Sequence, residues 1–326
     1  MVGGAGAADA ALASRLLFQL LAAPEVERPA KALAYLSAHW LWLEAALSAG
    51  STEPTVEAAC HALTKILSHA RSDAAALEVL ERCAPLLMNA AVVRGSVAAL
   101  SALATLIRIF KGASSSESLA KCLAGWIAEG VRGLLRGSPE CASQLPPDLL
   151  SALLEVLTIA LGPRCMLLAP LLLTAQNALL AEVIALVAPI LPSCASPRCI
   201  CWALLLADRL PHWLQQSGPH VQNVAQLLEV ALPHIAAACC QLLAASPLAA
   251  DGEVASALAK TLLSFSRACG QALAAALRQA AESVGVASDE GSLLVQQVGD
   301  PLQTEEALAE ALREAAQNWQ AEHQRE

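Results

Sequence analysis

The stretch PTVEAACHALTKILSHARSDAAALEVLERCAPLLM (54–88) indicates the fold of this chain. Its first half places apolar residues three and four positions apart, which puts them on one side of an α-helix. Thr52 and Pro54 suit the cap and first turn of that helix. Ser72 and Asp73 interrupt the pattern, and a second apolar stripe follows up to Met88. Two such helices form a hairpin that can bury its stripes only against similar neighbours.

The composition also favours helices. Hydrophobic residues make up 56% of the 326 residues, but aromatic residues make up only 3%. Alanine and leucine are strong helix formers, whereas strands favour aromatic and β-branched residues. The net charge of −9 and the pI near 5.3 argue against a nucleic-acid-binding surface, which would need clustered lysines and arginines.

Similar apolar segments recur along the chain, with starts near residues 58, 96, 148, 199 and 253. This spacing of about 40 to 55 residues is near the period of HEAT and armadillo repeats with loop insertions. In such arrays each hairpin buries its stripe against the hairpins before and after it. The sequence therefore predicts an all-α, HEAT/armadillo-like α-solenoid, a superhelix of antiparallel helix hairpins with about seven helix pairs.

The expected organisation has four parts. Residues 1–7 are predicted to be disordered, 8–284 to form the helical array, 285–303 to be irregular, and 304–326 to form a C-terminal helix and tail. Within the array we expect a new helix from Val92 to Phe110, one helix from Pro197 to Leu214, and a hairpin formed by helices Asp251–Ala268 and Gly270–Val284. Residues 221–243 are either one helix bent at Pro233 or a helix pair.

The cysteines raise the question of metal binding. Cys194, Cys199 and Cys201 could form a zinc site with His212. Structural zinc sites pair two close ligands with a second close pair, which His212 does not provide. Most of the 11 cysteines lie on apolar stripes, so we expect free thiols, no metal and no cofactor. No nucleophile elbow or glycine-rich phosphate loop is present, and the sequence does not predict an enzyme.

The mean hydropathy of +0.52 is high enough that a membrane-spanning segment must be considered. Residues 230–250 contain no Asp, Glu, Lys or Arg, and are long enough to cross a bilayer. However, Pro233, His234 and Gln241 lie inside this segment, and no aromatic belt or basic flank frames it. A packed helical core is the interpretation that we adopt, with no membrane partner.

One group of residues suggests a partner-binding site. His61, Lys65 and His69 recur every four residues and form a weakly basic ridge on one helix. The alternatives are a solvated face or a contact site for an acidic or phosphorylated partner. The tryptophans, including Trp40 and Trp213, are interpreted as packing residues.

Several segments resemble the later HEAT repeats of the importin-β (karyopherin) superfamily, in the branch that contains transportin-SR. They are HWLWLEAAL (39–47), TVEAACHALTKILSHA (55–70), APLLMNAAVV (84–93), PDLLSALLEVLTIAL (147–161), CMLLAPLLLTAQNAL (165–179) and LLVQQVGDPLQTEEALAEALREAAQNW (293–319). The resemblance covers residues 30 to 320 through pattern rather than through rare motifs. It is similar only to the carboxy-terminal arch of these receptors, and nothing matches their amino-terminal Ran-binding repeats.

The resemblance implies a nuclear transport receptor, or its cargo-binding part, in the cytoplasm and nucleus. Its partners would be protein cargo, and by resemblance the Ran GTPase and nucleoporins. In the transportin-SR branch, the helix matching residues 55–70 is rich in arginines that bind phosphorylated Arg-Ser domains. Here that face carries His61, Lys65 and His69, which does not fit this cargo. The alternative is a HEAT-repeat scaffold or assembly chaperone without a transport role.

Overall fold

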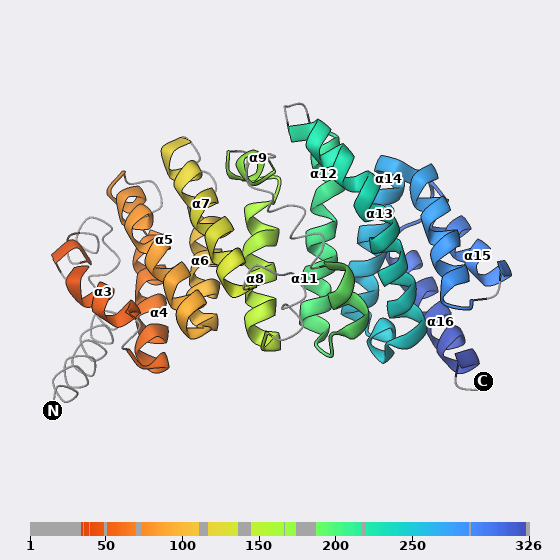
Figure 1. Cartoon of the computed structure of the whole chain (residues 1–326), viewed down its shortest axis with the longest axis horizontal. Helices are drawn as coiled ribbons and strands as arrows, with labels where there is room; N and C mark the ends of the chain where they lie inside the picture. The colour runs from red at the N-terminus through yellow and green to blue at the C-terminus, as the bar shows by residue number, and fades with distance from the viewer. Residues whose placement is uncertain are drawn as a thin grey trace. The chain divides into compact units, whose positions relative to one another are not determined.

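Every element that the structure describes is helical (Figure 1). The structure is a computed structural model of the chain. It describes residues 34, 36–38, 40–48, 51–69, 74–110, 117–135, 145–165, 167–173, 187–216, 220–286 and 288–323. The predictions for residues 1–7 and for a helix from Ala8 to Ala23 lie outside these residues. The all-α class predicted from the composition is confirmed.

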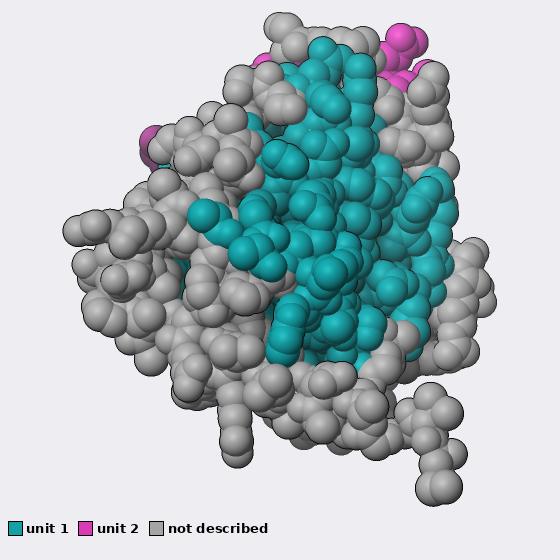
Figure 2. Space-filling view, turned by 90° about the vertical axis from the view of Figure 1, so that its left-hand side faces the viewer, with its two compact units in different colours: residues 1–137, 155–171 teal, residues 138–154, 172–326 magenta. Residues whose placement is uncertain are grey.

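The chain divides into two compact units. Unit 1 comprises residues 1–137 and 155–171, and unit 2 comprises residues 138–154 and 172–326. The division falls inside helix α8 (Pro147–Ala160). Figure 2 colours the two units, and the described residues of unit 1 form one continuous packed surface in that view.

Unit 1 contains α3 (Trp40–Leu47), α4 (Glu53–His69), α5 (Ala74–Arg94), α6 (Val97–Phe110) and α7 (Glu117–Leu134). It also contains the second half of α8 and most of α9 (Leu168–Leu172). Helix α4 packs against α6, and α5 packs against both α6 and α7. Helices α3, α4 and α5 therefore each contact the next helix and the next but one.

Most helix ends of the hairpin predicted in residues 54–88 agree with the structure. Helix α4 begins one residue before Pro54 and ends at His69, and its apolar stripe is buried, with Leu63 and Leu67 fully inaccessible. Helix α5 is longer than expected, because it continues through Val92 to Arg94. The prediction that a new helix starts at Val92 is wrong. The break lies at Gly95, whose φ of 66° suits a glycine at a helix C-terminus.

Unit 2 contains the first half of α8, then α11 (Pro197–Ala207), α12 (Arg209–Leu214), α13 (His220–Ala245) and α14 (Gly252–Ser283). A 3₁₀-helix, η5 (Pro247–Ala250), α15 (Ser288–Gly299) and α16 (Glu305–His323) complete it. Helix α14 lies at its centre and packs against α11, α12, α13, α15 and α16.

Two boundaries in unit 2 differ from the prediction. The expected single helix from Pro197 to Leu214 divides into α11 and α12. Pro211 is the reason that we assign, because it has no N–H to bond the carbonyl of Ala207. Helix α13 instead remains one helix across Pro233, which selects the first of the two alternatives. The expected hairpin of Asp251–Ala268 and Gly270–Val284 appears as one long element, α14, whose two helical parts are joined by a kink at Cys269.

The segment expected to be irregular, residues 285–303, is mostly helical. Helix α15 occupies Ser288–Gly299, and buries Leu294 and Val298 in its contact with α14. Acidic residues Asp289 and Glu290 in its first turn favour the helix through its dipole. The glycines and valines of this segment have low helix propensity, and tertiary packing stabilises the helix.

The C-terminal helix is as predicted. Thr304 accepts a hydrogen bond from the amide of Ala307 through its Oγ1, at 3.2 Å, and so caps α16. Gln320 near the other end donates its amide to the carbonyls of Leu243 (3.1 Å) and Ser246 (2.7 Å). Leu243 is near the end of α13 and Ser246 directly follows that helix, so one side chain ties α16 to the end of α13.

One helix segment is long and apolar enough to cross a bilayer, among the residues that the structure describes. It is Val221–Ala245 of α13, and 61% of its most apolar window is buried inside the molecule. The core helix of a soluble protein shows the same combination of length, composition and burial.

Candidate partner-binding ridge on helix α4

Helix α4 holds the three residues of the predicted ridge. His61 is exposed and Lys65 is half-buried, on the side of the helix opposite the buried Leu63 and Leu67. His69 is the last residue of α4, but its side chain lies outside the described part of the structure. The structure thus presents His61 at the surface, and the role of the three residues stays a prediction.

The same ridge carries acidic residues that the predicted binding site did not include. Glu57 precedes His61 by four residues and Glu53 precedes Glu57 by four, and both are exposed. Residues four apart are neighbours on a helix surface. The ridge therefore changes from acidic at the start of α4 to basic towards its end. This pattern was visible in the sequence, and it makes the surface one of mixed charge.

The start of α4 is held by its neighbours. Arg94, the last residue of α5, donates hydrogen bonds from its guanidinium to the carbonyls of Ser48 (3.2 Å) and Ser51. Ser96 donates its hydroxyl to the Glu53 carboxylate at 2.7 Å. These contacts join residues more than 40 positions apart, so they fix where the ridge begins relative to α5 and α6.

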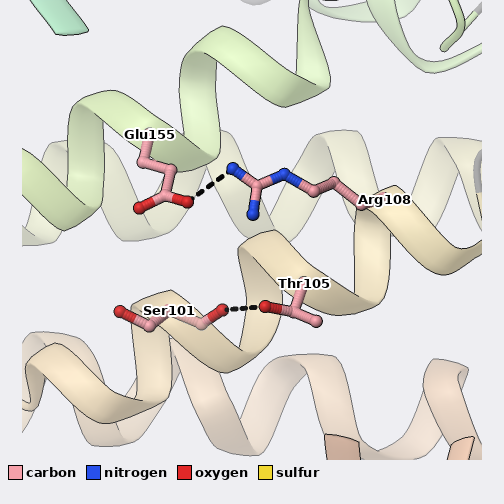
Figure 3. Close-up of polar contacts among 4 residues, drawn as sticks. All are labelled: Ser101, Thr105, Arg108 and Glu155. Carbon is pink, nitrogen blue, oxygen red and sulfur yellow. Dashed lines mark hydrogen bonds and ion pairs between the residues drawn. The ribbon is translucent and has the colours of Figure 1, made fainter. Parts of the chain in front are cut away.

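A further cation lies on α6, the helix that packs against α4. The Nη2 of Arg108 lies 2.6 Å from Oε1 of Glu155 on α8, and both residues belong to unit 1 (Figure 3). The Glu155 side chain is 10% exposed and that of Arg108 is 45% exposed. Nearby, Thr105 donates its hydroxyl to the carbonyl of Ser101 at 2.9 Å. Arg108 is thus held by a nearly buried carboxylate while part of it faces solvent.

The proposed zinc ligands do not form a metal-binding arrangement. Burial raises the pKa of the Cys199 and Cys201 thiols to about 11 each, with smaller contributions from nearby groups. Zinc binds the thiolate, which a raised pKa disfavours. The ring of His212 instead contacts the Trp213 ring edge-on, with 5.7 Å between ring centres. No group of three or more His, Cys, Asp or Glu side chains among the described residues could hold a metal ion.

Burial also raises the pKa of other thiols in the core. Burial raises the pKa of Cys60 to about 12, and the carboxylates of Glu53 and Glu57 add to that shift. Burial raises the pKa of Cys240 to about 12 and that of its neighbour Cys239 as well. These side chains act as small apolar residues in the packing.

Two tryptophans confirm the packing interpretation. Trp213 is 1% exposed and Trp40 is 5% exposed. The guanidinium of Arg82 lies over the Trp40 ring, 4.0 Å from its centre, and the indole N–H of Trp40 donates to Glu44. Stacking of this kind covers the ring face, so Trp40 offers no open slot for a ligand.

No protein-family model matches this sequence, and no curated protein matches it either. The likeness to importin-β-type receptors therefore depends on the segments quoted above.

Proposed function

We propose that this chain is a protein-binding module of the HEAT or armadillo type, which binds its partners without covalent chemistry. The packing order in unit 1 is the observation that supports this proposal. Helix α4 packs against α6 and α5 packs against α7, while each also contacts the helix that follows it. Stacked helix hairpins produce this alternation, because each hairpin shares its apolar stripes with the next.

The chemistry of the buried residues fits a binding role. The core consists mainly of alanine and leucine side chains, and its thiols are kept protonated by burial. Charged groups also lie on exposed helix faces, such as the ridge of α4. In helical-repeat proteins, such faces are the surfaces that bind partners.

Within this class, we propose a nuclear transport receptor or its cargo-binding part, on the strength of the sequence resemblance alone. The second candidate is a scaffold or assembly chaperone of the same architecture. The two differ in one property, namely whether a GTP-bound Ran GTPase releases the bound partner. Slight sliding between packed helices would let either protein adapt to its partner.

The experiment that separates them is capture of proteins from cell lysate on the purified full chain, with and without Ran locked in its GTP form. Mass spectrometry quantifies the bound proteins. Nuclear proteins that are released by Ran support the transport receptor. Partners that remain bound in its presence, and that are not nuclear, support the scaffold. Capture of no protein above a blank matrix contradicts the binding module itself.

The ridge is tested by a charge reversal and a matched control. Lys65→Glu places a negative charge among His61 and Glu57, and Lys121→Glu makes the same change on α7. Lys121 is 60% exposed and pairs with Glu117 at 2.7 Å. If an acidic partner binds the ridge, Lys65→Glu weakens its binding about tenfold, which corresponds to about 1.4 kcal/mol. Equal effects of the two substitutions would show that binding responds to net charge and not to the ridge.

A further inference from the structure

Helix α4 carries a row of charged side chains at positions four residues apart. The row runs from Glu53 through Glu57 and His61, which are exposed, to Lys65, which is half-buried. Side chains eight positions apart, such as those of Glu57 and Lys65, lie about 12 Å apart along a helix, twice the separation of helix neighbours. The opposite charges of this row are therefore not direct neighbours within one helix.

The residues beside this row have small side chains. Ala58 and Thr64 are both half-exposed on the same face, and neither is charged. The hydroxyl of Thr64 donates to the carbonyl of Cys60 at 2.8 Å, and the hydroxyl of Ser68 donates to the carbonyl of Lys65 at 2.7 Å. Both hydroxyls are thus bonded within α4 itself. A face with short side chains lets a second helix approach to the usual distance of about 8 to 10 Å between axes.

An antiparallel copy of α4 has the charge order that matches this face. Turning the helix end over end about His61 places position 57 opposite position 65, and position 58 opposite position 64. Glu57 then faces Lys65 of the second copy, and Lys65 faces Glu57 of the second copy. Ala58 and Thr64 meet in the same way, so small side chains meet small ones. The face is complementary to itself about a two-fold axis, and such an axis closes the assembly at two chains.

Two other charged helix faces lack this order. On α16, Glu306, Glu310 and Glu314 are exposed at four-residue spacing, and an antiparallel copy of that row would be repelled. On α7, Lys121 lies 2.7 Å from Glu117 of the same chain, so these two charges are paired within the helix.

We propose that α4 is a self-association surface, through which two copies of this chain pair antiparallel about His61. The inference does not rest on the proposed function, because it concerns the purified chain alone. Exposed ion pairs contribute little singly, but the two-fold axis forms each of them twice. A contact of one helix with one helix is small, below about 1,200 Å², as in transient complexes. We therefore expect a reversible dimer with a dissociation constant on the order of 100 µM.

The test is sedimentation velocity of the purified full chain at low salt, over concentrations on both sides of that dissociation constant. The wild type should change from monomer to dimer as its concentration rises. Glu57→Lys and Lys65→Glu, each alone, make both facing pairs alike in charge, so each should weaken dimerisation about tenfold. Circular dichroism checks that both variants remain folded.

Mixing the two variants separates charge pairing from a loss of structure. In a mixed pair, one chain is positive at positions 57 and 65 and the other is negative at both, so both facing pairs are again opposite in charge. The mixture should therefore dimerise at least as tightly as the wild type. Glu117→Lys and Lys121→Glu make the same exchange on α7, and they should leave dimerisation unchanged both alone and mixed.

Three results would overturn the proposal. One is a wild-type chain that stays monomeric at about ten times the expected dissociation constant. Another is a mixture of the two α4 variants that associates no more tightly than either variant alone. The third is a wild-type dimer that neither α4 substitution weakens, because its contact then lies on another surface. If the chain is monomeric and Lys65→Glu releases a partner captured from lysate, the ridge binds a different protein and self-association is excluded.

Discussion

The close packing of α7 on α5 leads to a prediction about Gly130. A Cβ atom built on Gly130 would lie 1.6 Å from the terminal methyl group of Met88 and 3.3 Å from its sulfur. Met88 is only 4% exposed, so its side chain has little room to move. Gly125, on the same helix, has no neighbouring atom within 4 Å of its Cβ position. The two glycines thus differ in packing while sharing one helix.

The expected free-energy changes follow from two opposing terms. Replacing glycine by alanine inside a helix stabilises it by about 1 kcal/mol. Forcing an extra methyl group into a packed core costs about 1 to 3 kcal/mol, although the flexible methionine side chain lowers this cost. Gly125→Ala should therefore raise the free energy of unfolding by about 1 kcal/mol. Gly130→Ala should lower it by about 1 kcal/mol, because overpacking exceeds the helix gain.

The assay is urea unfolding of each variant, followed by circular dichroism. A double-mutant cycle with Met88→Leu adds a direct test, since leucine lacks the terminal methyl group that the new Cβ would meet. Gly130→Ala should then cost less in the Met88→Leu background than in the wild type. If Gly130→Ala is as stabilising as Gly125→Ala, the result contradicts the packing of Met88 on α5 against Gly130 on α7.

Four further outcomes follow from other contacts. Arg108→Ala should cost about 1 to 2 kcal/mol in urea unfolding, since it leaves the nearly buried Glu155 without its guanidinium, and adding Glu155→Gln should recover part of that loss. Thr261→Val should cost about 1 to 2 kcal/mol, because the buried hydroxyl donates to carbonyls of both α11 and α14, while Thr261→Ser should cost less. Gln320→Ala should speed hydrogen exchange in α16 about fivefold, because it removes the hydrogen bonds that tie α16 to the end of α13. Burial raises the pKa of the Cys60 thiol from its ordinary 9.0 to about 12. The contribution of this thiol to the free energy of unfolding is therefore full below pH 9, and it falls by about 1.4 kcal/mol per pH unit as the pH rises towards 12. In alkaline unfolding, Cys60→Ala should reduce this slope.

Helix positions were predictable where the apolar stripe was continuous and a capping residue marked its end. Helix α4 begins one residue before Pro54 and ends before Ser72 and Asp73, the residues that mark its two ends in the sequence. The local pattern failed at α15, where glycine and valine lowered the helix signal of residues 285–303. That helix is stabilised by burying Leu294 and Val298 in its contact with α14, a contact that no local pattern contains.

The candidate site was less predictable than the fold. The four-residue spacing of His61 and Lys65 correctly placed both away from the buried stripe of α4, because helix geometry alone determines this. The acidic residues Glu53 and Glu57 share the ridge, and they were available to the same argument. The pairing of Arg108 with Glu155 was not, since its partners are 47 residues apart and meet only through packing.

The difference between fold and function has a physical cause in this chain. Burial selects side chains by size and polarity, so the apolar stripe can be read from spacing whatever the partner is. The exposed face of α4 is under no such constraint, so apolar spacing does not predict its charges. The mixed ridge from Glu57 to Lys65 would repel a uniformly acidic partner at one end and attract it at the other. A partner that pairs with the whole ridge would need the opposite order of charges, basic against Glu57 and acidic against Lys65. Binding that depends on this order would fall with Lys65→Glu and also with Glu57→Lys, whereas a purely acidic partner would bind Glu57→Lys more tightly. These two substitutions on one helix therefore identify the charge pattern of the partner before its identity is known.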